Sequence, residues 1–252
     1  MSYNTKDLKN KIRERIWRTL EEKGIALPPR PARGRIPNFI GAKEAAEKLL
    51  KLHIWKKARI VKSNPDSPQK WVREAALRDK KTLLMATPRL KKGFLLLDPK
   101  TLPRHLLRIA STIRGAFQLG RIISLEELAE IGSIDLIITG SVAVDVHGNR
   151  LGKGEGYAEI EYGVLAELSL VSENTPIVTT VHDLQVVDYI PVDPYDLRLD
   201  YIVTPTRVIE VQGSRARPKG IYWEVLPCKK LEEIPLLYLL AKSRGKLDKC
   251  RK

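Results

Sequence analysis

Cysteine is scarce in the 252-residue sequence, which carries only Cys228 and Cys250. A small secreted protein held together by disulfides would need more, and no cysteine and histidine have the spacing of a zinc site. No apolar run approaches the roughly 20 residues of a membrane helix, and no apolar segment follows the first residues as in a signal peptide. We therefore expect a cytoplasmic, monomeric protein that does not enter a membrane.

Aromatic residues are also few, at 6%, yet hydrophobic residues make up 43% of the chain. A chain of this size can fill a core without disulfides or structural metals. The sequence predicts a single domain over residues 1–252. The Lys-rich end, residues 243–252, is expected to be a frayed basic tail.

The charges are unevenly distributed along the chain, whose formal net charge is +15. The net charge is +20 over residues 1–124, −12 over residues 125–210 and +7 over residues 211–252. This segregation indicates a basic half that receives a polyanion and an acidic segment that complements it or holds a cation. A nucleotide and a nucleic acid are both candidate polyanions, and ordinary solvated surface charge would account for many of these residues equally well.

Hydrophobic spacing predicts alternating strands and helices after an N-terminal helix over residues 3–23. A proline- and arginine-rich ordered loop is expected over residues 25–41, and a second helix over Ala42–Leu52. The predicted strands are Ala58–Lys62, Thr82–Ala86, Phe94–Leu97, Asp135–Thr139, Pro176–Val181 and Asp200–Thr204. The predicted helices between them are Lys70–Asp79, Pro103–Ala110, Leu125–Ile131 and Glu159–Leu170, and Val208–Val211 with Ile221–Leu226 is expected to form a hairpin. Such alternation is typical of an α/β protein with a mostly parallel sheet covered on both faces.

Four glycines lie within nine residues between Gly148 and Gly156, after a strand-like segment and before a predicted helix. Closely spaced glycines let backbone N–H groups converge on an anion, and the following helix N-terminus adds a positive dipole end. Arg150 and Lys153 add cationic side chains. The spacing matches neither the P-loop nor the dinucleotide-binding fingerprint. We therefore predict a phosphate-binding loop of another kind, with a flexible surface turn as the alternative.

The segment from Asn149 to Glu159, Asn-Arg-Leu-Gly-Lys-Gly-Glu-Gly-Tyr-Ala-Glu, resembles the signature of the 5-formyltetrahydrofolate cyclo-ligase (methenyltetrahydrofolate synthetase) family. Further residues fit the same family: Lys9 and Arg13 in the first helix, and Gln185, Pro191 and Asp196 before the last main strand. Other segments are similar to its divergent branch, the methenyltetrahydrofolate synthetase domain-containing proteins: Arg35–Phe39, Asn64–Asp66, Thr87–Leu90, Gly140–Val144, Val181–Asp188 and Tyr201–Ile209.

This resemblance implies a Rossmann-like three-layer α/β/α fold of the kind shared with sugar-phosphate isomerases and CoA transferases. It also implies a ligase that uses ATP and Mg²⁺ on a folate, 5-formyltetrahydrofolate, to give 5,10-methenyltetrahydrofolate, ADP and phosphate. Tyr157 and Arg150 are then the expected catalytic residues, and Glu159 is the expected magnesium ligand. The implied nucleotide-binding residues are Lys9, Arg13, Arg150, Gly152, Lys153, Gly154, Glu155, Gly156 and Tyr157.

The chain departs from the family pattern at several positions. Ala158 replaces a second tyrosine, Ile160 stands where many bacterial members have arginine, and residues 63–67 lack the glutamate that contacts the folate in typical members. The alternative hypothesis is a weak or inactive family member that binds a nucleotide, or RNA through its basic half. No RNA-recognition signature supports RNA beyond charge. A third hypothesis is an ATP-dependent enzyme acting on a different formyl or carboxyl substrate.

Overall fold

The computed structural model describes residues 4–213 and 217–247. The strands of its central sheet are β3 (Ile60–Ser63), β4 (Thr82–Ala86), β5 (Phe94–Leu97), β6 (Arg121–Ile123), β7 (Leu136–Ile138), β10 (Ile177–Thr180), β12 (Tyr201–Val203) and β13 (Val208–Glu210). They lie in the order β13-β12-β10-β7-β3-β4-β5-β6. The strands from β12 to β4 are parallel, whereas β13, β5 and β6 pair antiparallel at the two edges. The predicted mixed α/β fold with a mostly parallel sheet is confirmed.

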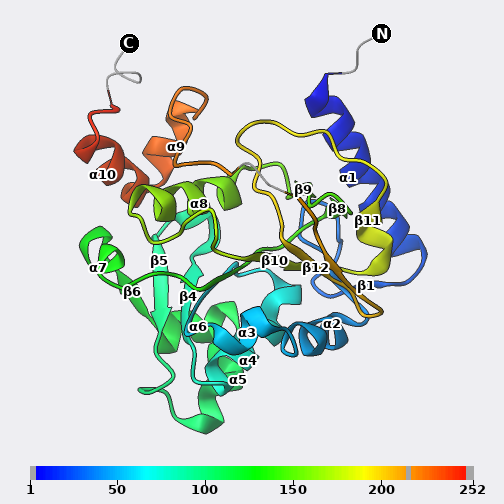
Figure 1. Cartoon of the computed structure of the whole chain (residues 1–252), viewed down its shortest axis with the longest axis horizontal. Helices are drawn as coiled ribbons and strands as arrows, with labels where there is room; N and C mark the ends of the chain where they lie inside the picture. Colours follow the sequence, from blue (N-terminus) through cyan, green and yellow to red (C-terminus); the bar gives the residue numbers. More distant parts are fainter. Residues whose placement is uncertain (1–3, 214–216, 248–252) are drawn as a thin grey trace.

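Helices cover both faces of this sheet (Figure 1). The helices are α1 (Thr5–Glu22), α2 (Ala42–Leu49), α3 (His53–Lys57), α4 (Lys70–Arg78), α5 (Leu107–Ala110), α6 (Ile113–Leu119), α7 (Leu125–Ala129), α8 (Tyr157–Glu167), α9 (Cys228–Glu233) and α10 (Pro235–Ser243). Single 3₁₀ turns span Ser67–Gln69, Pro88–Leu90, Arg104–Leu106 and Asp183–Gln185.

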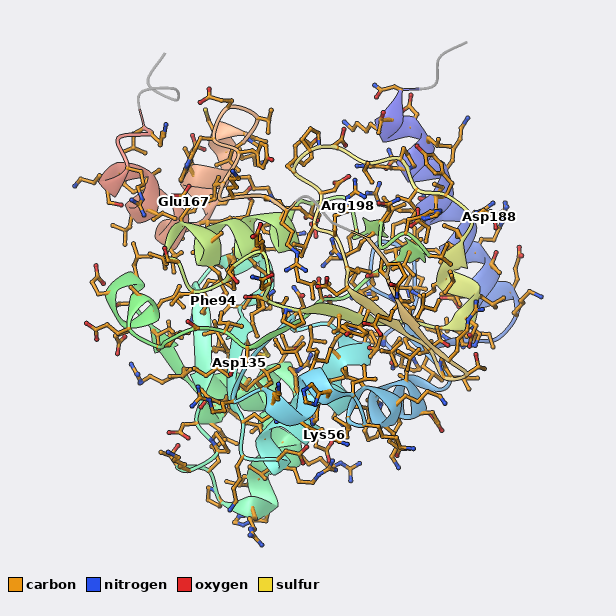
Figure 2. The ribbon with its side chains drawn as sticks, in the orientation of Figure 1. Lys56, Phe94, Asp135, Glu167, Asp188 and Arg198 are labelled. Carbon is orange, nitrogen blue, oxygen red and sulfur yellow. The ribbon has the colours of Figure 1, made fainter. Side chains whose placement is uncertain are left out.

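The alternation of side chains along each strand creates a separate core on each face of the sheet. Leu84, Ile137 and Phe94 belong to the core under α7, α8, α9 and α10, and Figure 2 labels Phe94. Leu83 and Leu136, each one residue away from a member of that core, belong to the core under α2 to α6. The runs of consecutive apolar residues thus follow from burial on both faces.

A smaller sheet stands beside the main one and carries the glycine-rich segment. Its strands are β8 (Ala143–Asp145), β9 (Arg150–Leu151) and β11 (Val186–Val187), in the order β11-β8-β9. Helix α1 packs Ile12, Ile16 and Leu20 in a third core with residues of this sheet. The N-terminal helix is therefore brought next to a segment about 140 positions later in the chain (Figure 1).

The predicted hairpin between Val208–Val211 and Ile221–Leu226 is wrong. Strand β13 pairs with β12, and residues 221–226 form no strand. Instead, Trp223 donates its indole N–H to Glu167 Oε1 at 3.0 Å, which ties this segment to the end of α8. Periodicity showed two apolar segments but could not show that they pack on different partners.

Other predicted elements differ in their bounds. The helix predicted over Ala42–Leu52 corresponds to α2, which ends at Leu49, and the short helix α3 that follows it was not predicted. The proline-rich loop over residues 25–41 contains the small antiparallel pair β1 (Ala26–Leu27) and β2 (Asn38–Phe39). Of the tail expected to fray, residues 243–247 are described. There, Arg244 Nη2 donates to the Glu167 carbonyl at 2.6 Å. Residues 248–252 lie outside the described residues. Within residues 4–213 and 217–247, no helix is both long and apolar enough to cross a bilayer.

Candidate active site

A cleft of about 890 Å³ opens at the carboxyl ends of β3, β4 and β7. Its lining includes Asn64 and Asp66 after β3, Thr87 and Arg89 after β4, and Gly140 after β7. In the sheet order, the chain leaves β3 toward β4 on one side and returns to β7 on the other side. Parallel sheets bind ligands at such a reversal because loops diverge there and leave a crevice. The order of the strands therefore favours a cleft at this position, and the glycine-rich loop lines part of it.

The glycine-rich loop enters the cleft between β9 and α8. Gly154 and Gly156 adopt left-handed φ angles of 94° and 75°, which side-chain-bearing residues rarely reach. Gly156 is also the N-cap of α8, and no side chain caps that end of the helix. The first amide groups of α8 therefore face the cleft, where they favour an anion.

Gly148, by contrast, lies in the turn between β8 and β9 and does not line the cleft. Its N–H donates to the Asp145 carbonyl at 3.0 Å. A Cβ on Gly148 would lie 2.5 Å from the carbonyl oxygen of Leu199. The tight turn therefore explains why residue 148 is glycine without any ligand. The part of the glycine-rich segment that lines the cleft is Gly152–Gly156.

Every residue that the sequence assigned to the site lines this cleft: Lys9, Arg13, Arg150, Gly152, Lys153, Gly154, Glu155, Gly156, Tyr157 and Glu159. Their functional roles remain predictions, but tertiary structure gathers them from α1, β9, the loop and α8.

Arg13 binds the loop directly, whereas Arg150 lies close to Gly152 and binds the chain after β7. Arg13 Nε donates to the Gly152 carbonyl at 2.8 Å, and a Cβ on Gly154 would lie 3.3 Å from the Arg13 guanidinium carbon. Arg150 Nε donates to the Gly140 carbonyl at 3.0 Å. Burial and the nearby Arg150 charge lower the pKa of Arg13. Two guanidinium groups lie close together here, an arrangement that an anion would stabilise.

Lys9 is almost fully buried and lies between two carboxylates. Its Nζ donates to Asp193 Oδ2 at 2.6 Å and to Asp196 Oδ2 at 2.5 Å. Burial by itself would lower the pKa of Lys9, but the hydrogen bonds and charges of the two aspartates outweigh burial and raise it. Lys9 is therefore an ammonium ion held in the cleft by the segment before β12.

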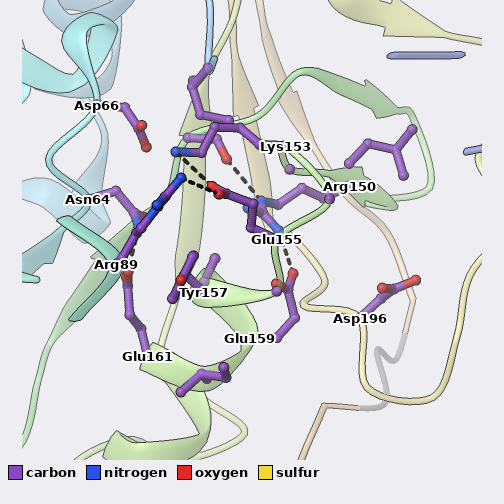
Figure 3. Close-up of a pocket in the computed structure, with 18 of the residues that line it drawn as sticks. Asn64, Asp66, Arg89, Arg150, Lys153, Glu155, Tyr157, Glu159, Glu161 and Asp196 are labelled. Carbon is purple, nitrogen blue, oxygen red and sulfur yellow. Dashed lines mark hydrogen bonds and ion pairs between the residues drawn. The ribbon is translucent and has the colours of Figure 1, made fainter. Parts of the chain in front are cut away.

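Figure 3 shows the side chains of Arg89 and Lys153 both reaching the carboxylate of Glu155. Arg89 Nη2 lies 3.2 Å from Glu155 Oε1, and Lys153 Nζ lies 3.4 Å from Glu155 Oε2. Arg89 has φ 57°, an uncommon left-handed conformation for a residue with a side chain. Local strain of this kind tends to occur at functional sites, and here it lies at the carboxyl end of β4.

The two remaining predicted residues have partners that bear on their roles. Glu159 accepts a hydrogen bond from Arg150 Nη1 at 2.7 Å. Tyr157 directs its hydroxyl to Glu233 Oε2 at 3.4 Å, and Lys230 Nζ lies 3.4 Å from the centre of its ring. A catalytic role for the Tyr157 hydroxyl would require it to exchange this partner for a substrate oxygen.

The described residues contain no group of three His, Cys, Asp or Glu side chains that could hold a metal ion. Glu159 alone therefore could not form a complete protein cage. Magnesium commonly takes one or two carboxylates and completes its octahedral shell with phosphate and water oxygens. A single carboxylate such as Glu159 is compatible with a magnesium ion whose other ligands are phosphate and water oxygens.

Sequence reasoning missed the side of the cleft where Asn64 lies with the acidic residues Asp66 and Glu161. Glu161 is only 3% exposed and pairs with the equally buried Lys62, which lies 99 positions away in the sequence. Asn64 Nδ2 also donates to Glu161 Oε2, at 2.7 Å. A lysine inside a strand and a glutamate inside a buried helix were the available signals, because such charges are rarely buried unpaired.

Comparisons with known proteins agree with this architecture. A sequence model of the 5-formyltetrahydrofolate cyclo-ligase family matches residues 5–205. A methenyltetrahydrofolate synthase domain-containing protein of Bos taurus is 44% identical over 234 residues, which are 91% of this chain and 60% of that protein. A 5-formyltetrahydrofolate cyclo-ligase of Mycolicibacterium smegmatis is 32% identical over 79 residues, 31% of this chain and 38% of that protein.

Among solved structures, Aquifex aeolicus 5,10-methenyltetrahydrofolate synthetase matches with a TM-score of 0.50 at 21% identity, over 84% of this chain and 96% of that one. At this identity the match concerns the fold alone. The chain spans about three fifths of the length of the Bos taurus relative. Together these matches confirm the resemblance carried by residues 149–159 and the three-layer α/β fold.

Proposed function

The chain belongs to the 5-formyltetrahydrofolate cyclo-ligase family, and on that premise we propose that it converts 5-formyltetrahydrofolate and ATP into 5,10-methenyltetrahydrofolate, ADP and phosphate. The observation that carries the proposal is the gathering of Arg13 and Arg150 around Gly152–Gly156 in a large cleft. Phosphoryl transfer needs little covalent help from a protein. It needs cations and oriented N–H groups around the transferred phosphoryl group.

In the proposed reaction, the γ-phosphoryl group of ATP is transferred to the formyl oxygen of the folate. The N10 amine then attacks the activated carbon, and the oxygen leaves with phosphate. Arg13 and Arg150 would neutralise the charge on the transferred group, while the amides of Gly152–Gly156 orient its oxygens. When bound, Mg²⁺ would neutralise further phosphate charge, with Glu159 as its protein ligand.

Lys9 adds a feature that the family resemblance did not imply. Asp193 and Asp196 already neutralise its charge and take two of its three N–H donors, so Lys9 has one donor left for a phosphate unless it leaves an aspartate. The two aspartates would hold Lys9 charged and in place until a nucleotide competes for it. The contribution of Lys9 to ATP affinity should therefore be smaller than that of a lysine without ion-pair partners, because its charge is already paired with two aspartates before ATP binds.

The residues that depart from the family pattern bear on the rate. Ala158 and Ile160 line the cleft, and neither of their apolar side chains can donate a hydrogen bond to the substrate. Removing one preorganised donor typically costs about 10²–10³ in rate. We therefore expect turnover well below that of family members with the tyrosine and arginine.

The test is to incubate the purified protein at neutral pH with ATP, Mg²⁺ and 5-formyltetrahydrofolate and to follow the absorbance of the methenyl product. Product should form only when all components are present. Arg150→Met should abolish it, and Arg121→Met, which removes an exposed arginine of β6, should leave it unchanged. No product from the wild-type protein over hours would overturn the proposal.

A further inference from the structure

Helix α9 lies beyond residue 205, where the match to the family model ends, and yet it forms part of the wall of the cleft. Its Lys230 lines the cleft, as does Tyr157 at the start of α8. Leu231 and Ile234 are buried in the core that also lies under α8, and Figure 1 shows α9 close to α8. The family resemblance assigns no role to α9, although buried neighbours fix its position.

Lys230 and Glu233 of this helix contact two different parts of the Tyr157 side chain. The Lys230 ammonium nitrogen lies 3.4 Å from the centre of the Tyr157 ring, well inside the limit of about 6 Å for a cation–π interaction. The Tyr157 hydroxyl donates to Glu233 Oε2 at 3.4 Å. Residues three apart lie on the same face of a helix, so one face of α9 holds both the ring and the hydroxyl.

The charge of Lys230 is directed at the ring and not at a carboxylate. Two other lysines of the cleft, Lys9 and Lys153, each pair with a carboxylate. The neighbouring Lys229 pairs with Glu233, at 3.8 Å, whereas Lys230 makes no ion pair with any residue in 4–213 and 217–247. The positive charge therefore acts on Tyr157 without being neutralised first.

The two contacts have opposite effects on the Tyr157 hydroxyl as a donor. A cation over the face of a phenol ring stabilises negative charge on the phenol oxygen, so it makes the hydroxyl a stronger donor. Glu233 competes with a substrate, because it occupies the same hydroxyl proton. At 3.4 Å this contact is longer than the about 2.5–3.0 Å of an ordinary O–H···O hydrogen bond, so a substrate oxygen would displace it at little cost.

We propose that Lys230 and Glu233 are positioning residues for Tyr157. Lys230 strengthens the Tyr157 hydroxyl as a donor to the formyl or phosphoryl oxygen on which negative charge develops. Glu233 holds that hydroxyl until the substrate oxygen takes its place. The inference rests on the proposed function for the identity of that oxygen, whereas the two contacts from α9 do not depend on it.

The kinetic test looks for effects of opposite sign on methenyl formation. Lys230→Met should lower kcat about 5- to 10-fold, because the cation no longer strengthens the donor. Glu233→Gln should raise kcat about two- to fivefold, because a neutral amide competes less well for the hydroxyl. KM should stay within about twofold in both variants, since the effect is felt in the transition state. A loss in Lys230→Met that is confined to KM would overturn the inference.

The matched controls come from the same helix. Lys229→Met and Glu232→Gln remove the same types of charge at neighbouring exposed positions and should leave kcat within about twofold. The effects of Lys230→Met and Glu233→Gln should also disappear when each is combined with Tyr157→Phe, which lacks the hydroxyl. Effects of the same size on the residual rate of the Tyr157→Phe protein would overturn the inference.

A measurement without turnover separates this inference from the proposed reaction. In the full chain labelled with ¹³C-tyrosine, the ring signal of Tyr157 is identified by its loss in Tyr157→Phe. Lys230→Met should shift this signal and Lys229→Met should not, and ATP, Mg²⁺ and 5-formyltetrahydrofolate together should shift it in the wild type. An unshifted signal in Lys230→Met would overturn the positioning role whatever the activity. Both shifts without any methenyl product would support positioning and contradict the ligase function.

Discussion

Two ends of the cleft were assembled in different ways: the donor end at Gly152–Gly156, where amides and cations line the cleft, and the acceptor end at Asn64, Asp66 and Glu161, where carboxylates line it. The donor end is built around a contiguous segment, Gly152–Gly156, whose backbone conformation depends on residue types that are visible in the sequence. The acceptor end joins Asn64 after β3 to Glu161 inside α8, 97 positions apart. A local motif therefore predicted a site for an anion, but only the tertiary structure, which brings β3 next to α8, places two carboxylates beside that site.

The two ends share one principle, which is the pairing of the basic first half with the acidic segment. Lys9 pairs with Asp196, Lys62 with Glu161, and Arg89 with Glu155. In each pair the cation comes from residues 1–124 and the anion from residues 125–210. The expectation that the acidic segment complements the basic half is confirmed at these pairs, so part of the charge segregation serves the interior and not an external polyanion.

The largest effect expected at the donor end is that of Arg150→Met. The Arg150 side chain is 3% exposed, and its removal leaves Glu159 and the Gly140 carbonyl without this donor. Breaking a buried pair on one side costs about 3–5 kcal/mol, so the free energy of unfolding in urea should fall by that order. If Arg150→Met lowers the free energy of unfolding no more than the exposed Arg121→Met does, the stability of the donor end does not depend on the contacts of Arg150 with Glu159 and Gly140.

Removing the cations of α1 should weaken nucleotide binding while leaving the acceptor end intact. Arg13→Ala should cost about 1.5–3 kcal/mol of ATP affinity by calorimetry, the usual value for a charge-assisted hydrogen bond. Lys9→Ala should cost less, because Asp193 and Asp196 already occupy the ammonium group. Arg18→Ala, an exposed residue on the same helix, is the control. If Arg13→Ala and Lys9→Ala both leave ATP affinity unchanged, α1 has a structural role only and does not bind the nucleotide.

Gly154→Val should weaken Mg²⁺-dependent ATP binding by about 10-fold, because a side chain there would strain a backbone at φ 94° and press on Arg13. Gly24→Val is a matched control. It has a left-handed φ of 68°, with nothing within 4 Å of the added Cβ, and lies outside the cleft. It should lower stability without changing ATP affinity. Equal ATP affinity for the Gly154→Val and Gly24→Val variants would show that the loop does not contact ATP.

The smallest expected effect is on the pH dependence of stability, which should have opposite signs for Asp66 and Asp183. Burial raises the pKa of Asp66, so its ionised form lowers stability as pH rises above the unfolded value. Asp66→Asn should therefore stabilise the protein near neutral pH, by about 0.5–2 kcal/mol, and should lose that advantage in acid.

For Asp183, burial would raise the pKa, but hydrogen bonds from Thr206 and Thr204 outweigh it and lower the pKa. Its contribution is present at neutral pH and is lost as pH falls below the unfolded value, so Asp183→Asn should destabilise the protein near neutral pH. Melting temperatures of both variants across a pH series would check the two signs. A destabilising Asp66→Asn at neutral pH would mean that its carboxylate has a partner.

Most strands of the sheet could be predicted from apolar runs, because burial on both faces leaves few polar positions in β3, β4, β7 and β10. The edge strand β6 and the two C-terminal helices could not. In β6, Arg121 and Ile122 are exposed, so the segment lacks the apolar signal. The wrong hairpin had a different origin: both of its segments are apolar, but β13 pairs with β12, and composition does not decide which strand is the partner.

What the sequence by itself determined is local. It determined the amphipathic face of α1, the alternating order of strands and helices, and the backbone freedom of Gly154 and Gly156. These depend on neighbours within a few residues. The tertiary structure decided which charges meet. It placed Lys9 between Asp193 and Asp196, directed Arg13 to the loop, and buried Glu161 beside Lys62. Such pairing depends on the arrangement of the sheet and its covering helices, because an ion pair forms between groups that the fold brings within about 4 Å, however far apart they lie in the chain.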